Sequence, residues 1–231
     1  MEVLRVSKID LIKTVEELPI DEQTERLSAA NVAFELGGLA IKFAQVERTP
    51  RYTETEREND AEHSFMLALV ANELSTLLYP DLDNGKVSQY AIVHDLIETI
   101  TGDVATFKIS TEDLILKQQR EHDALNTLLK TLPPHTAQLL SSYEQQDCRE
   151  ARFVKAVDKL LPVITDVIGP GAQVMIEDYN VTTSEDLKVS HNALHSRIAT
   201  TFEEFPSIVS AHRILCDLFE AEFEAASTLK R

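Results

Sequence analysis

Apolar residues recur at every third or fourth position along most of this chain, which is the spacing of one face of an α-helix. The clearest stripe lies within residues 60–79 and consists of Met66, Leu67, Val70, Leu74, Leu77 and Leu78. The same periodicity predicts further helices over residues 7–18, 21–46, 86–101, 111–131, 135–146, 149–168, 172–179, 184–202 and 206–226. Because no segment shows a convincing strand alternation, we predict an all-α fold.

Capping and breaking residues set the limits of these helices. Asn59 or Asp60 is expected to cap the helix that follows, and Gly102 can end the next one because glycine tolerates positive φ. Pro162 should kink or restart the helix that contains it. Residues 47–59 have no apolar period and include a proline, so we predict a loop there.

The composition is that of a globular protein with a real core. Hydrophobic residues make up 43% of the chain, and six glycines and eight prolines are few, which favours long helices with short connections. We find no repeat and no linker. We therefore expect one domain over residues 1–231, a bundle of about eight to ten helices with its core over about 30–200 and the terminal helices packed on it.

Charge and cysteine usage restrict the partners and the compartment. Lys and Arg total 22 against 39 Asp and Glu, and the resulting net charge of −17 repels a phosphate backbone, which makes duplex nucleic acid an unfavourable partner. The sequence has neither a long apolar run nor the features of a signal peptide, and Cys148 and Cys216 read as isolated thiols. We expect a cytoplasmic protein with no membrane partner.

Two polar residues interrupt the apolar faces of predicted helices. His63 lies three and four residues before Met66 and Leu67, so its imidazole is predicted to point inward. Asp158 lies within the apolar arc of its own helix, where a carboxylate is costly unless it is paired or bound to a cation. Its neighbour Lys159 is predicted to point elsewhere.

Residues 94–103 carry one imidazole and three carboxylates. In a helix, His94 and Glu98 stack on one face and Asp95 lies about 100° around the axis, so one site can use all three. Asp103 follows the glycine on a loop that can fold back toward the same face.

The inward polar residues together form a possible metal site. His63, His94, Asp95 and Asp158 supply two imidazoles and two carboxylates, a set that suits Mn²⁺, Fe²⁺, Co²⁺, Ni²⁺ or Zn²⁺ better than Ca²⁺. Such an ion activates water and polarises a phosphoryl oxygen, and Glu98 is placed to orient or deprotonate that water. Taken singly, His63 could be a satisfied buried histidine and Asp158 could pair with an arginine.

Other charged residues are open to simpler interpretations. Arg48, Arg51 and Arg57 lie in the predicted loop and could donate to a phosphate. His191 and His195 have a spacing that could bind a metal, but a solvated helix face is the better interpretation, and the single residues His122, His135 and His212 receive no role.

The pattern of ligands resembles the HD-domain superfamily of metal-dependent phosphohydrolases, whose signature is a His, then His-Asp, then a distant Asp. Within it, the sequence is most similar to the 5′-deoxynucleotidase branch. The likeness lies in Ala-Glu-His-Ser (61–64), His-Asp-x-x-Glu-x-x-x-Gly-Asp (94–103), Lys-Ala-Val-Asp (155–158) and Arg48-Thr49-Pro50, which is similar to that branch's Arg-Trp-Pro. It covers roughly residues 30–200.

This resemblance implies a role for each matching residue. His63, His94, Asp95 and Asp158 would be the metal ligands, and Glu98 would be the catalytic carboxylate, with Asp95 acting beside it. The remaining roles concern the substrate: Arg48 would contact the phosphate, Asp103 the sugar, and Thr49 stands where the branch has a tryptophan that helps to shape the deoxyribose pocket. The resemblance also implies a homodimer with one metal per subunit.

We therefore expect a metal-dependent 5′-nucleotidase that removes phosphate from deoxyribo- or ribonucleoside 5′-monophosphates. One alternative keeps the metal site and hydrolyses a nucleoside triphosphate to pyrophosphate or tripolyphosphate. A third hypothesis is a nucleotide-binding HD protein without turnover, against which the intact ligand set and Glu98 argue.

Overall fold

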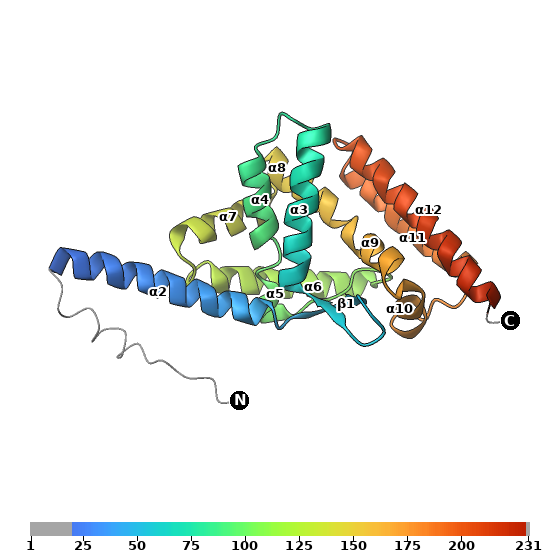
Figure 1. The fold of residues 1–231 in the computed structure, drawn as a ribbon, viewed down its shortest axis with the longest axis horizontal. Helices are drawn as coiled ribbons and strands as arrows, with labels where there is room; N and C mark the ends of the chain where they lie inside the picture. The colour runs from blue at the N-terminus through green and yellow to red at the C-terminus, as the bar shows by residue number, and fades with distance from the viewer. Residues whose placement is uncertain (1–19, 230–231) are drawn as a thin grey trace. The chain divides into compact units, whose positions relative to one another are not determined.

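The computed structural model describes residues 20–229, and this part of the chain is almost entirely helical (Figure 1). The helices are α2 (Ile20–Phe43), α3 (Asp60–Leu78), α4 (Asn84–Val93), α5 (Glu98–Thr101), α6 (Thr111–Leu128), α7 (Pro134–Gln145), α8 (Arg149–Asp158), α9 (Leu161–Ile168), α10 (Gly171–Glu177), α11 (Ser184–Thr201) and α12 (Pro206–Leu229). The predicted all-α class is confirmed. The helix predicted over residues 7–18 lies outside the described residues.

The chain divides into two compact units, residues 1–42 and residues 43–231. In the first unit the structure describes α2, which agrees closely with the helix predicted over 21–46. The single domain predicted over residues 1–231 stays a prediction. The second unit holds all the candidate site residues, and the remaining description concerns it alone.

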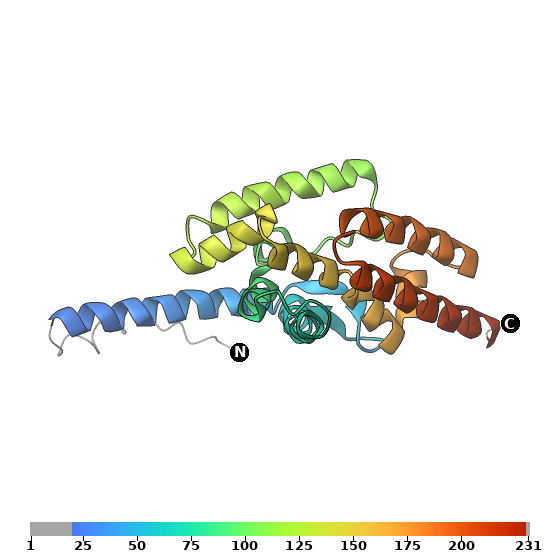
Figure 2. The same cartoon turned by 90° about the horizontal axis from the view of Figure 1, so that it is seen from above.

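The second unit contains two apolar clusters. Helices α3, α4 and α8 pack around the first, where Leu67, Val87 and Val154 are fully buried. Helices α9, α10, α11 and α12 enclose the second, which contains Val174 and Phe219. Both views show α11 and α12 side by side along one flank (Figures 1 and 2). The α8–α9 pair therefore passes from one cluster to the other.

Residues 47–59 form a short β-hairpin, so the predicted loop was wrong. Strands β1 (Glu47–Arg51) and β2 (Arg57–Asn59) pair antiparallel, with an irregular register between their ends. The strands are short and rich in charged residues, so they lack the alternation of apolar and polar residues that predicts a strand. Arg51 and Arg57 pair with Asp178, which follows α10, and are not directed at a phosphate site.

The helix predicted over 86–101 is interrupted, and the interruption falls on the polar motif. α4 ends at Val93, and the N–H groups of Leu96 and Glu98 donate to carbonyls three residues earlier, as in a 3₁₀ turn. Gly102, with φ of 71°, ends α5 as predicted. The tighter turn changes the directions of the side chains that a continuous helix would have stacked.

The segment over 149–168 breaks as predicted, because Pro162 occupies the first turn of α9. Among the described residues, no single helix has both the length and the apolarity to cross a membrane, although the bent pair 149–168 and 171–177 passes that test by length and composition.

Candidate metal centre

His63 enters the centre from the first turn of α3. Asn59 caps this helix in a capping box with Glu62, which fixes the direction of the first turn. The imidazole is fully buried; its Nδ1–H donates to Glu58 Oε1 at 2.9 Å, and its Nε2 lies 3.0 Å from Asp158 Oδ1. Burial opposes a charged imidazolium, but these two carboxylates outweigh it and raise the pKa of His63 to about 9. The Nε2 side of the ring therefore favours a cation.

His94 lies directly after α4, and its ring is also buried. Nδ1 donates to the carbonyl of Ala91 at 2.9 Å, which leaves Nε2 as the lone-pair nitrogen of a neutral ring. Nε2 lies 2.9 Å from Asp95 Oδ2 and 4.0 Å from Asp158 Oδ1, yet it has no hydrogen bond. A buried nitrogen lone pair that faces two carboxylates is costly unless a cation lies between them.

Asp158 closes the group at the end of α8. Besides His63, it contacts Lys159, whose Nζ lies 2.6 Å from Asp158 Oδ2, so the prediction that Lys159 points elsewhere was wrong. The break in the helix after Asp158 turns the lysine back toward its neighbour. Burial would raise the pKa of Asp158, but Lys159 and His63 together hold it well below its usual value.

The donor atoms lie close enough together to hold one ion. One ligand atom each from His63, His94 and Asp158 lies within 4.8 Å of the other two, and Asp95 adjoins His94. A divalent metal fits this set of two imidazole nitrogens and two carboxylates. Hydrogen bonds and ion pairs to neighbouring groups hold these side chains in place. The structure thus brings together the four ligands predicted from separate helices.

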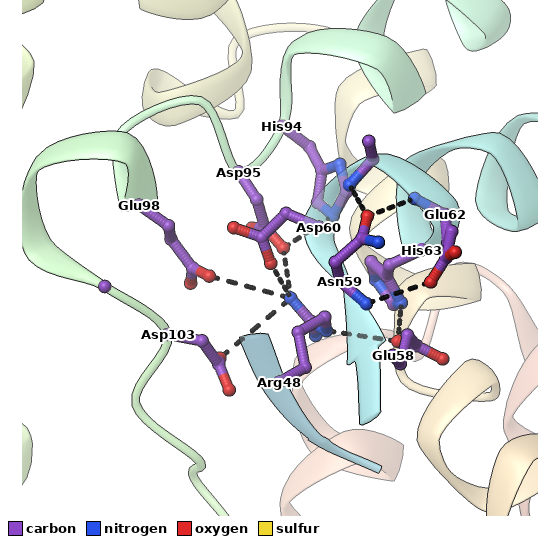
Figure 3. Close-up of polar contacts among 12 residues, drawn as sticks. Arg48, Glu58, Asn59, Asp60, Glu62, His63, His94, Asp95, Glu98 and Asp103 are labelled. Carbon is purple, nitrogen blue, oxygen red and sulfur yellow. Dashed lines mark hydrogen bonds and ion pairs between the residues drawn. The ribbon is translucent and has the colours of Figure 1, made fainter. Parts of the chain in front are cut away.

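Arg48 projects from β1 into the acidic side of the centre (Figure 3). Its Nη1 lies 3.0 Å from Asp60 Oδ1 and 2.9 Å from Asp95 Oδ2, and its Nε lies 3.1 Å from Glu58 Oε1. The same guanidinium reaches toward Glu98 at 3.6 Å and toward Asp103 at 3.9 Å. Arg48 is therefore the cation that compensates this acidic cluster.

Glu98 is the carboxyl most strongly perturbed toward its neutral form. Burial, followed by the charges of Asp95 and Asp103, raises the pKa of Glu98 to about 10 in the cation-free protein. Lys117 on α6 lies 3.8 Å from Glu98 Oε1 and is the second cation beside it. A group in this position can hold or accept a proton according to the charge brought into the site.

Several partners in the centre escaped the sequence analysis. Glu58 and Asp60 precede His63 on the hairpin and the first helical turn, and Lys117 belongs to a helix whose polar face looked solvated. Asp60 lies one helical turn before His63, and this spacing could have indicated that the two side chains lie on the same side of the helix. Nothing local distinguished Lys117 from a surface lysine.

Two histidines assigned to polar surfaces are buried. His191 is 3% exposed and its Nδ1 donates to Glu220 Oε1 at 2.9 Å, whereas His212 is fully buried beside His195. The solvated face predicted for α11 was therefore wrong, because α12 covers it. Within residues 20–229 these histidines belong to no group of three potential metal ligands.

A cavity of about 350 Å³ opens onto the centre. His94, Asp95, Glu98 and Asp158 line one end of it, and Arg48, Thr49 and Asp103 line the adjoining wall. Tyr179 also lines this cavity. Burial raises the pKa of its phenol, and Thr49 lies close enough to oppose that rise, so an aromatic ring from another part of the chain adjoins Thr49.

Comparison with known proteins agrees with this geometry. A 5′-deoxynucleotidase of Homo sapiens is 30% identical over 125 residues, which are 50% of this chain and 58% of that protein. A 5′-deoxynucleotidase of Saccharomyces cerevisiae is 28% identical over 112 residues, which are 44% of this chain and 49% of that protein. The chain thus spans only about half the length of these relatives.

A crystal structure gives wider coverage. It is described as a predicted metal-dependent phosphohydrolase from Magnetospirillum magnetotacticum MS-1, and it matches 84% of this chain and 94% of its own with a TM-score of 0.65 at 25% identity. The HD domain model matches residues 42–202, a range that contains every residue of the centre. By this match, which extends over more than half of its length, the chain belongs to the HD domain family.

Proposed function

We propose that the protein is a metal-dependent 5′-nucleotidase that releases inorganic phosphate from deoxyribo- or ribonucleoside 5′-monophosphates. The observation that carries this proposal is the convergence of His63, His94 and Asp158 within 4.8 Å, beside an arginine and a neutralised glutamic acid in one cavity. The names of the relatives and of the matched structure point to the same reaction class.

The proposed ligands are His63, His94, Asp95 and Asp158, and the proposed metal is Mn²⁺, Co²⁺, Fe²⁺, Ni²⁺ or Zn²⁺. A divalent ion held there would lower the pKa of water and polarise a phosphoryl oxygen. The mixed imidazole and carboxylate set supports a transition metal over Ca²⁺.

Side chains of the protein would accept the proton and bind the phosphate. Burial and the charge of Asp95 keep Glu98 neutral; positive charge added at the proposed ligands would offset the repulsion from Asp95, so that Glu98 could take a proton from the attacking water. Arg48 lines the same cavity and can donate to phosphate oxygens with its planar guanidinium, while Asp103, which lines the cavity beside it, would contact the sugar.

The direct test is a phosphate-release screen over paired ribo- and deoxyribonucleoside 5′-monophosphates, with Mn²⁺ or Co²⁺ added and with chelator as the control. We expect metal-dependent release of phosphate. Deoxynucleoside triphosphates are included because pyrophosphate or tripolyphosphate as product would favour the alternative reaction. A metal-loaded protein inactive on every ester would overturn the proposal.

We also propose a cytoplasmic homodimer with one metal per subunit. The dimer and the metal count rest on the family resemblance, and the free thiols Cys148 and Cys216 suit a reducing compartment. Light scattering coupled to size-exclusion chromatography tests the dimer, elemental analysis tests the metal count, and cell fractionation tests the compartment.

A further inference from the structure

The cavity beside the metal centre has two chemically different ends. The end already described is charged. The apolar end of the cavity is lined by Val163 of α9, Met175 of α10, Tyr179 after α10, Ile198 of α11, and Phe107 from the connection between α5 and α6. A ligand that fills the whole cavity must therefore join an anionic group to an apolar or aromatic one.

An aromatic pair forms one wall of the apolar end. Phe107 and Tyr179 meet edge to face, with ring centroids 4.9 Å apart and an interplanar angle of 78°. Thr49, which β1 carries next to Arg48, lies close enough to Tyr179 to lower the pKa of its phenol against the larger effect of burial. The strand that compensates the acidic cluster thus also adjoins the aromatic wall, and a planar ring can pack against that wall.

One carboxyl group interrupts this apolar end. Asp166 on α9 is 9% exposed and lines the cavity, yet its Oδ1 has no hydrogen bond, and no ion pair of Asp166 occurs among the described residues. α10 begins directly against it: a Cβ at Gly171 would lie 2.3 Å from the Asp166 carbonyl oxygen, so only glycine permits this approach. Burial, with the charge of Glu58, raises the pKa of Asp166 to about 7.

A second acceptor faces the same end. His191 lines the cavity, and because its Nδ1–H donates to Glu220, the neutral ring keeps Nε2 as an acceptor. Burial lowers the pKa of His191, which keeps the ring neutral. Above about pH 7, where Asp166 is ionised, the apolar end therefore offers two hydrogen-bond acceptors and calls for a ligand that brings donors.

We propose that this end of the cavity binds the nucleobase and that Asp166 selects bases with an exocyclic amino group. The proposal rests on the nucleotidase function proposed above, which places the phosphate at the metal. Asp158 at the end of α8 and Asp166 on α9 both line this one cavity, so a nucleotide that fills it can reach both ends. Cytosine and adenine present an amino donor where uracil and hypoxanthine present a carbonyl oxygen, which an acceptor pair repels.

Matched substrates isolate this amino group. dCMP and dUMP have nearly the same size, as have dAMP and dIMP, and the members of each pair differ in the group that faces the acceptors. A site built around a hydrogen bond rejects an analogue that cannot make it, so at about pH 8, where Asp166 is ionised, we expect wild-type kcat/KM to favour dCMP over dUMP and dAMP over dIMP by about tenfold or more.

The Asp166→Asn variant tests the residue itself. An amide of the same size can donate to a carbonyl oxygen, so dCMP should lose about tenfold in kcat/KM while dUMP keeps or gains activity. A merely structural role would lower kcat/KM for both substrates equally. Asp123→Asn, an exposed change on α6, is the matched control and should leave both ratios unaltered.

Binding of the free nucleosides separates this inference from the nucleotidase function. Titration calorimetry of metal-free wild-type protein with deoxycytidine and deoxyuridine needs no phosphate and no turnover, and we expect deoxycytidine to bind more tightly in a manner that Asp166→Asn abolishes. If the protein bound deoxycytidine more tightly but hydrolysed no ester, the nucleotidase proposal would be wrong and the base site would stand. Equal binding of both nucleosides, or a substrate ratio within roughly threefold in wild type, would overturn the base site.

Discussion

Two carboxyl groups of the cavity, Asp158 and Asp166, are equally buried and have opposite electrostatics. Each is 9% exposed. Asp158 faces His63 and Lys159, and its pKa is held well below the usual value, whereas Asp166 makes no ion pair within residues 20–229 and burial raises its pKa to about 7. Burial alone therefore does not determine the state of a carboxyl group. The charges on the packed neighbours decide it.

The difference follows from the helices that each residue faces. At the end of α8, Asp158 faces the imidazoles of His63 and His94. The helix ends there, and the next residue, Lys159, pairs with the Asp158 carboxylate. Asp166 lies eight residues later on α9, the helix that contributes Val163 to the second apolar cluster, and Cys216 of that cluster is close enough for the Asp166 charge to bear on its pKa. The surroundings of Asp158 suit a metal ion, and those of Asp166 suit an uncharged hydrogen-bond donor of a bound ligand.

Removing Asp158 should have the largest effect on this contrast. Asp158→Ala leaves two imidazoles without their shared anion, so bound metal should fall to background and phosphatase activity should drop by at least about 10³-fold, with helical circular dichroism retained. Elemental analysis and phosphate release measure the two losses. Full activity in this variant would remove Asp158 from the centre.

Glu98→Gln should separate metal binding from turnover. The amide keeps the size of Glu98 and cannot accept a proton, so we expect normal metal content with kcat lower by about 10²- to 10⁴-fold. Glu121→Gln, on the acid that pairs with Lys117, is the control for a general change in charge. Unchanged kcat in Glu98→Gln would show that another group takes the proton.

The sequence could point to this charged end because two of the proposed ligands interrupt strong apolar periods and the other two lie in one polar motif. His63 and Asp158 stood out on buried helical faces, and their convergence with residues 94–95 needed only that the helices pack together. The hairpin escaped prediction because its strands are held by backbone pairing and by ion pairs, neither of which leaves an apolar pattern.

The apolar end was invisible for a different reason. Asp166, Tyr179 and His191 each look like ordinary polar residues along the chain, and only the sharp approach of α10 and the covering by α12 bury them. The sequence also could not show which aromatic residue lies beside Thr49, the position where the deoxynucleotidase branch has a tryptophan, because Tyr179 is 130 residues away in sequence. Such pairings depend on tertiary packing and leave no local signal.

Arg48 is the cation shared by the carboxylates of the charged end, and its removal should have the next largest effect. Arg48→Ala strips the shared cation from Asp60, Asp95 and Glu58, so we expect a loss of about 3–5 kcal/mol in the free energy of unfolding of metal-free protein. We also expect kcat/KM to fall by about tenfold or more. Denaturant unfolding and phosphate release measure these effects.

Arg48→Lys is the informative control. It keeps the charge but cannot span several carboxylates with a planar fork, so stability should recover more than kcat/KM does. Equal recovery of both would mean that Arg48 acts through charge compensation alone.

The smallest predicted effect is a gain of stability at the apolar end. Asp166 has a pKa of about 7 in the folded protein against an ordinary value of 3.8, so between these values the folded state holds a proton that the unfolded state has released. Its contribution to stability therefore falls as pH rises toward 7. Asp166→Asn removes this penalty, and we expect a gain of about 1–3 kcal/mol in urea unfolding at about pH 8, with a smaller gain at about pH 5.

The titratable neighbours allow this gain to be assigned to Asp166. The pKa values of Tyr179 and Cys216 are raised to about 12 by burial, so neither group titrates in the measured range, and Glu58 is unchanged between the two proteins compared. Asp123→Asn should show no gain at either pH. If Asp166→Asn were instead destabilised equally at both pH values, the carboxyl group would be part of the fold's own hydrogen bonding. A gain in stability coupled to a loss of base selection would mark Asp166 as a residue kept for its ligand at the expense of the fold.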